Sequence, residues 1–154
     1  MSKLIYIIVA FILLIFPTTT KIEKPNYKLS DLVIEYNRSS VMEYNAPFYE
    51  VKLYADKYIT YGYSNEDDLI RRDLTDEEYK EIIDYAFSNV FMSLDTNLTN
   101  PNILDGEHSG IYLYADGEII FHTGGDNVTN SRYNKLVHLL MDKKKEEEKW
   151  KYYP

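Results

Sequence analysis

Histidines and carboxylates are the side chains in this 154-residue sequence whose types and spacing could support metal or acid–base chemistry, and there are only three histidines. His108 follows Asp105 and Glu107, and His122 precedes Asp126 by four residues. Two imidazoles with one carboxylate form a common zinc ligand set, and an ion with an open fourth position activates water. If strand pairing brings these residues to one end of a sheet, His108, His122 and Asp105 or Asp126 would form a metal-assisted hydrolase.

The same histidines also fit an ordinary role as polar residues that hydrogen-bond locally, because no paired ligand motif accompanies them. The third, His138, lies beside the apolar stripe of an expected helix. The sequence has no cysteine, which removes thiolate ligands, cysteine nucleophiles and disulfides. It also contains no phosphate loop, nucleophile elbow or HExxH motif. The sequence therefore nominates no catalytic residue and no cofactor, and a non-enzymatic protein is the better interpretation.

Sixteen tyrosines are the most unusual feature of the composition. If Leu53 and Leu113 point toward a core, strand alternation sends a second set of side chains to the opposite face. That set is Lys52, Tyr54, Tyr58, Thr60, Tyr112, Tyr114, Ile120 and His122. Tyrosine combines rigid apolar area with a polar tip and recurs where proteins recognise proteins or stack on sugars. We predict a binding face made of Tyr54, Tyr58, Tyr112, Tyr114, Ile120 and His122.

A structural role for these tyrosines is the competing interpretation, because cross-strand aromatic pairs stabilise any sheet. The polar segment 37–47 or the C-terminal tail could also cover them. The sequence leaves a binding face and a structural face both open.

Two segments about sixty residues apart have the alternating pattern of β-hairpins. The first covers residues 48–63 and the second begins near Ile111, and both contain Leu-Tyr-Ala-Asp, at 53–56 and 113–116. In the second copy Gly117 follows the aspartate, and glycine accepts the positive φ that a tight turn needs. A shorter β-prone run at residues 32–36 precedes both hairpins.

Each hairpin is followed by an expected helix. Thr75 and Glu78 form a capping box, and an apolar stripe at helical spacing follows up to Val90. The second helix begins near Thr129 or Asn130. The order ββα-ββα predicts an α+β fold, with an antiparallel sheet of four or five strands and both helices on one face. The expected helix-facing set is Val51, Leu53, Ile59, Tyr61, Ile111, Leu113, Ile119 and Phe121.

The N-terminus has the pattern of an export signal. Lys3 precedes an apolar run at residues 4–16, which Pro17 and three threonines end. Thirteen helical residues rise only about 20 Å, less than the roughly 30 Å of a bilayer core. We therefore predict a signal peptide or N-terminal anchor at residues 1–20 and a secreted or extracytoplasmic location. A linker at 21–30, one domain at 31–141 and a charged tail at 142–154 complete the expected organisation.

The charge balance limits the possible partners. With 17 basic against 25 acidic residues the net charge is −8, which disfavours nucleic acid and leaves the N-terminal segment as the only expected membrane contact. The Asp-containing turn in a tyrosine-rich hairpin, the helix opening at residues 74–78, and Asp105 with Gly106 before the second hairpin resemble small exported bacterial domains of unknown function. That resemblance implies location and fold and assigns no site. The expected partner is a protein or a cell-envelope glycan, and a purely structural envelope protein is a further alternative.

Overall fold

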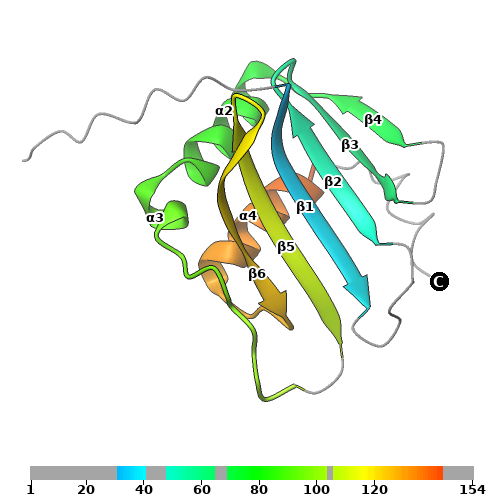
Figure 1. Ribbon diagram of the computed structural model, residues 1–154. Coiled ribbons are helices and arrows are strands. Elements are labelled where there is room, and N and C mark those ends of the chain that lie inside the picture. The colour runs from blue at the N-terminus through cyan, green and yellow to red at the C-terminus, as the bar shows by residue number, and fades with distance from the viewer. Residues whose placement is uncertain (1–30, 41–47, 65–68, 104–105, 144–154) are drawn as a thin grey trace, which may run out of the picture.

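A six-stranded antiparallel sheet organises the computed structural model, which describes residues 31–40, 48–64, 69–103 and 106–143 (Figure 1). The order of the strands in space is β4-β3-β2-β1-β5-β6, so β1 joins the two hairpins β2–β3 and β5–β6. The strand bounds are β1 Leu32–Ser40, β2 Tyr49–Tyr54, β3 Tyr58–Tyr63, β4 Ile70–Asp73, β5 Glu107–Ala115 and β6 Glu118–Asp126. Every neighbouring pair is antiparallel.

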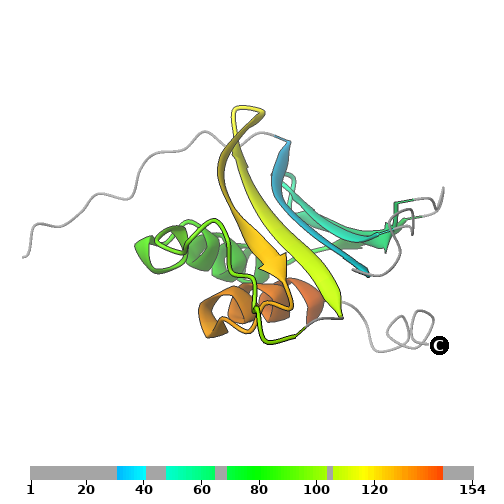
Figure 2. The ribbon, with the colours of Figure 1, turned by 60° about the horizontal axis from the view of Figure 1, so that its bottom comes forward.

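The helices of the described residues lie on one face of this sheet, as the rotated view shows (Figure 2). They are α2 Asp76–Ala86, the single-turn α3 Asn89–Met92 and α4 Ser131–Met141. The predicted capping box is confirmed, since Thr75 Oγ1 accepts from Glu78 N at 3.2 Å and Glu78 Oε2 accepts from Thr75 N at 2.9 Å. Asn130 caps α4 by accepting from the backbone of Arg132 and Tyr133. The α+β class, the antiparallel sheet and the placement of the two longer helices on one face are as predicted.

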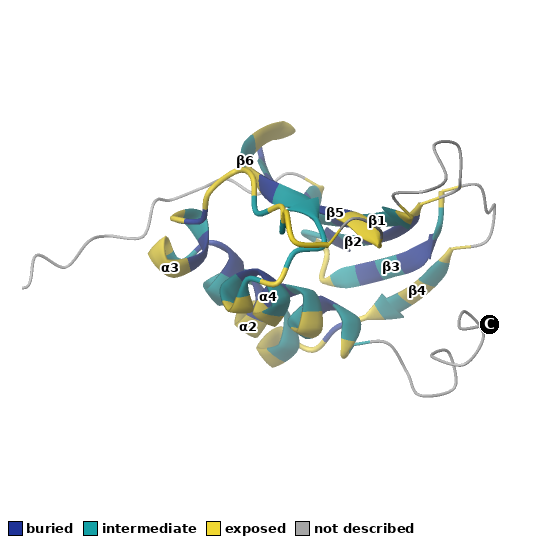
Figure 3. Ribbon diagram, turned by 90° about the horizontal axis from the view of Figure 1, so that it is seen from below, coloured by how far each residue is buried: buried dark blue, intermediate teal, exposed yellow. Residues whose placement is uncertain are grey.

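The core lies between the sheet and the helices, where the buried residues gather (Figure 3). Six of the residues expected to face the helices are almost fully buried, namely Val51, Leu53, Ile59, Tyr61, Ile111 and Leu113. Two buried tyrosines also form polar contacts: Tyr61 donates to the Leu140 carbonyl and Tyr133 to Ser109 Oγ. Burial raises the pKa of Tyr133 strongly, although its hydrogen bond to Ser109 opposes the rise.

The prediction of four or five strands in ββα-ββα order was wrong, because β4 was missed. Its sequence is Ile-Arg-Arg-Asp, with three charged side chains in four residues, and this pattern does not indicate a strand. The strand forms at the sheet edge, where such side chains reach water on the outer face. The Arg72 side chain lies on the opposite face of β4, where its guanidinium is 2.8 Å from Glu78 Oε1. This ion pair links β4 to the start of α2.

A β-bulge in β6 overturns two side-chain assignments. The register shifts between Leu113 and Tyr114, so Ile119 pairs with Tyr114 and lies on the outer face, 52% exposed. Ile120, expected on that face, is partly buried and packs against the core. A bulge adds one residue to one strand and thereby reverses the alternation beyond it.

The predicted signal peptide or anchor at 1–20 and the linker at 21–30 lie outside the described residues, as do Asp105 and residues 144–154 of the tail. Among the described residues, no helix is long and apolar enough to cross a membrane. The last described helix, α4, ends at Met141.

Candidate binding site

The sheet face opposite the helices, which we call the outer face, carries the predicted tyrosines. Paired residues in adjacent strands share a face, so the register places one row of side chains across all six strands. From β4 to β6 this row is Arg71, Thr60, Lys52, Glu35, Tyr112 and His122. Tyr54, Tyr58 and Tyr114 lie on the same face. The register therefore places these four tyrosines on one face of the sheet.

Tyr54 and Tyr58 contact each other at the β2–β3 end of the outer face. Their rings stack with centroids 4.4 Å apart and planes 13° apart, and the guanidinium of Arg71 lies 3.8 Å from the centre of the Tyr58 ring. Such cross-strand and cation–π contacts stabilise a sheet and occupy the ring faces that a ligand would need. This pair therefore fits the structural role.

Tyr114 is engaged by a charged network in the middle of the face. Its hydroxyl donates to Glu35 Oε2 at 2.9 Å, and Lys52 Nζ contacts Glu50 Oε2 at 2.8 Å. Burial, with the hydrogen bond and charge of Glu35, raises the pKa of Tyr114 to about 12. Burial alone would lower the pKa of Lys52, but the hydrogen bond to Glu50 and the charges of Glu50 and Glu35 raise it. These polar groups satisfy one another.

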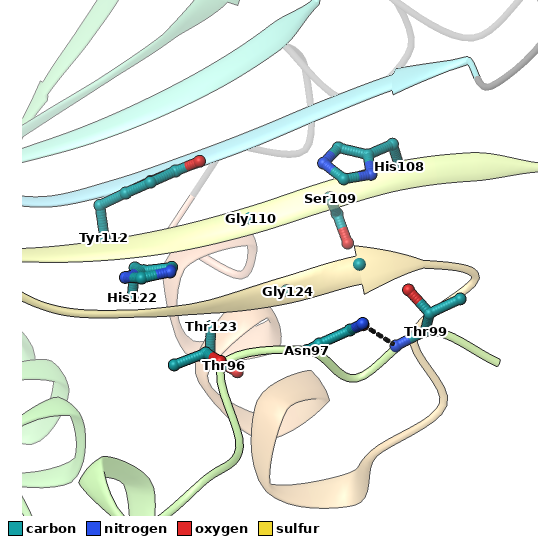
Figure 4. A pocket seen from close by; sticks show the side chains of 11 residues that line it. Thr96, Asn97, Thr99, His108, Ser109, Gly110, Tyr112, His122, Thr123 and Gly124 are labelled. Atoms are coloured by element: carbon teal, nitrogen blue, oxygen red, sulfur yellow. Dashed lines mark hydrogen bonds between the residues drawn. The ribbon is translucent and has the colours of Figure 1, made fainter.

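Tyr112 differs, because it borders an open pocket of about 270 Å³ at the β5–β6 end of the sheet (Figure 4). Its ring is nearly parallel to that of His122, with planes 16° apart and centroids 6.2 Å apart. Gly110 and Gly124 form the floor between the strands, and Asn97 closes the side. The Tyr112 hydroxyl has no hydrogen-bond partner among the described residues. This part of the tyrosine face combines a pocket with polar groups available to a ligand.

The pocket exists because two glycines face each other across the ladder. Gly110 pairs with Gly124, so neither strand raises a side chain there. A Cβ atom on Gly124 would lie 2.2 Å from the carbonyl oxygen of Ser109, so only glycine fits. The Tyr112 ring occupies the space above Gly110, where an added Cβ would come within 3.1 Å of it.

The segment 96–100 forms the outer wall by running beside the end of β6. Leu98 N donates to the Gly124 carbonyl at 2.7 Å, and Asn100 N donates to the Asp126 carbonyl at 2.8 Å. Asn97 Oδ1 accepts from Thr99 N at 2.9 Å, which fixes its side-chain amide at the pocket side and leaves Nδ2 available. Backbone pairing thus places this loop segment beside the end of β6.

His108 stands at the opposite end of the pocket from Tyr112. Its Nδ1 lies 2.8 Å from Asp126 Oδ1. Because a carboxylate accepts only from a protonated nitrogen, this contact places the proton on Nδ1 and leaves Nε2 of the neutral ring as an acceptor. Figure 4 shows the His108 ring and the Tyr112 hydroxyl pointing toward one another along β5, with Gly110 between them.

The zinc set proposed from the sequence is not assembled in this register. His108 pairs with Asp126, whereas His122 pairs with Tyr112, four residues further along the ladder. Four strand residues span about 13 Å, while zinc ligands lie about 2 Å from the ion. Among the described residues no group of three His, Asp or Glu side chains is placed to hold a metal, and Asp105 lies outside them.

The structure therefore divides the predicted face. It brings Tyr112 and His122 together at the pocket, pairs Tyr54 with Tyr58 elsewhere, engages Tyr114 with Glu35, and turns Ile120 toward the core. Several residues of the pocket were not predicted as site residues, among them Asn97 and Gly110. Gly110 could have been found from its pairing with the Gly124–Gly125 step, whereas nothing local to Asn97 indicates its position.

Comparison with known proteins adds no assignment. No protein-family model matches this chain, and no curated protein is similar to it.

Proposed function

We propose that this protein is an exported, non-enzymatic binding module whose ligand docks on the outer face at Tyr112 and His122. Export is supported by the charged, apolar and polar sequence pattern of residues 1–20. The partner classes expected from the sequence are a protein and a cell-envelope glycan, and the pocket favours the glycan. Its lining combines a tyrosine ring, two histidine rings and an amide around a floor of glycines.

One observation carries the proposal: polar groups without a partner among the described residues border a floor made of two glycines. The Tyr112 hydroxyl, Asn97 Nδ2 and His108 Nε2 all border the pocket, and no described residue takes up their hydrogen-bonding capacity. Elsewhere on the face the Tyr114 hydroxyl donates to Glu35, and the rings of Tyr54 and Tyr58 stack on each other. A ligand is the missing partner that this arrangement supports.

The test measures how much isolated envelope polysaccharide the purified protein retains. Tyr112→Ala removes the aromatic wall, and we expect capture to fall at least about tenfold, equivalent to about 1.4 kcal/mol. Tyr54→Ala is the matched control, since it removes a ring from the same face away from the pocket. Thermal unfolding followed by circular dichroism establishes that both variants are folded.

Equal capture by folded Tyr112→Ala and the native protein would remove the binding site and favour a structural envelope protein. The hydrolase alternative is tested with the same samples. Stoichiometric zinc in native mass spectra, lost in His108→Ala, would support a metal-assisted hydrolase and contradict the non-enzymatic module.

A further inference from the structure

We propose that the pocket between Tyr112 and His108 is a subsite for one uncharged, hydroxyl-bearing sugar residue, and that Asp126 sets its hydrogen-bonding pattern through His108. This inference rests on the proposed binding function and narrows its ligand to a chemical class. It excludes a protein side chain or an acidic sugar as the favoured occupant.

The size of the pocket favours a single ring. Its volume of about 270 Å³ lies just below the range of about 300–1,000 Å³ for small-molecule sites. A protein partner would instead require a broad, well-packed area of roughly 800 Å² on each side. On this face the β2–β3 end is already occupied by the Tyr54–Tyr58 stack and by Arg71.

The hydrogen-bonding groups match a sugar hydroxyl pattern. His108 Nε2 accepts, Asn97 Nδ2 donates, and the Tyr112 hydroxyl does both. Each sugar hydroxyl also donates and accepts, so neighbouring hydroxyls on one ring can pair with all three groups. The parallel rings of Tyr112 and His122 add an aromatic surface beside them.

The charge of the pocket disfavours anions. No Lys, Arg, Asp or Glu is among the described residues that line it, and the carboxylate of Asp126 lies directly behind His108. The full chain carries −8, so its field also opposes an acidic ligand. An uncharged sugar ring can enter such a site without the electrostatic repulsion that an acidic ligand would meet.

Asp126 acts as a positioning residue, because its carboxylate determines which His108 nitrogen carries the proton. Asp126→Asn allows the amide to donate to Nδ1, which moves the proton to Nε2 and turns the acceptor into a donor. Long-range proton–nitrogen NMR spectra of the imidazole show directly which nitrogen carries the proton. A general loosening of the fold would not move the proton from one nitrogen to the other, so this readout separates positioning from a structural effect.

The experiment titrates the full-length protein with short neutral oligosaccharides and with uronic-acid oligosaccharides of the same length, using calorimetry. We expect saturable binding of at least one neutral oligosaccharide and at least tenfold weaker binding of its acidic counterpart. His108→Ala should weaken neutral binding about five- to tenfold, the loss of about one hydrogen bond. Tyr58→Ala serves as the control and should bind as the native protein does.

Asp126→Asn should weaken the binding of the neutral oligosaccharide in the same titration. The imidazole spectrum of the folded variant should show the proton on Nε2 instead of Nδ1. Three results would overturn the inference: preference for the acidic oligosaccharide, unchanged affinity in His108→Ala, or no neutral binding up to millimolar concentration. If no neutral oligosaccharide binds but capture of envelope polysaccharide still depends on Tyr112, the sugar subsite is wrong and the proposed binding module stands. If capture of envelope polysaccharide does not depend on Tyr112 either, the sugar subsite and the binding module are both wrong.

Discussion

Gly124→Ala is the substitution whose cost follows most directly from the geometry of the pocket floor. The new Cβ would lie 2.2 Å from the Ser109 carbonyl oxygen, and because Cβ atoms essentially never approach an atom more closely than 3.0 Å, the backbone of the facing strands must shift. Overpacking costs about 1–3 kcal/mol, and weakening the Leu98–Gly124 backbone hydrogen bond adds about 1 kcal/mol. We expect a loss of about 2–4 kcal/mol in the free energy of unfolding.

Urea denaturation measures this loss, with Gly110→Ala as the matched control. There the nearest atoms are the ends of the Tyr112 and Asn37 side chains, at 3.1 and 3.2 Å, and these can move. Gly110→Ala should therefore cost less than about 1 kcal/mol. A Gly124→Ala protein as stable as the native one, or the two variants equally destabilised, would refute the derived geometry of the floor.

Three further predictions concern stability away from the pocket. Thr75→Ala removes the cap of α2 and should cost about 0.5–2 kcal/mol in urea denaturation. The pKa of Glu78 is lowered by its hydrogen bond from the Thr75 backbone and by Arg72, so the native protein should lose this contribution as pH falls from about 4.5, and Glu78→Gln should flatten that acid limb. Because the pKa of Tyr114 is raised to about 12 from 10, its contribution should be complete below pH 10 and lost as pH rises toward 12. Tyr114→Phe should make the alkaline limb of the thermal stability curve less steep, and an unchanged limb would contradict the burial of the Tyr114 hydroxyl and its contact with Glu35.

The parts of the fold that the sequence predicts are those determined by neighbouring residues. The Asp116–Gly117 turn has φ values of 52° and 83°, the positive φ at both positions that the two-residue hairpin turn requires. The capping box at Thr75 likewise depends on residues three apart. Both features were predicted correctly because their signals lie within a few residues.

The missed features depend on contacts across the sheet. β4 is a strand because it pairs with β3 and because Arg71 and Arg72 find partners in Tyr58 and Glu78. The bulge that exchanges Ile119 and Ile120 is set by the register of β5 against β6. Neither pairing can be predicted from the propensities of neighbouring residues in the sequence.

The candidate site shows the same division. Alternation placed Tyr112 and His122 on one face, and the ladder then made them neighbours. Alternation could not distinguish Tyr112 from Tyr54, because the difference lies in what surrounds each ring. Asn97 reaches the pocket only through the backbone pairing of its segment with β6.

The most direct test of the binding site is an NMR titration of the isotope-labelled protein with fragments of envelope glycan. The site proposed here predicts saturable shift changes confined to the residues around the pocket, with the largest at Tyr112, His122, His108 and Asn97. Tyr54 and Tyr58 on the same face should not respond. Shift changes centred on Tyr54 and Tyr58 or on the helical side, or no change at any residue, would contradict it.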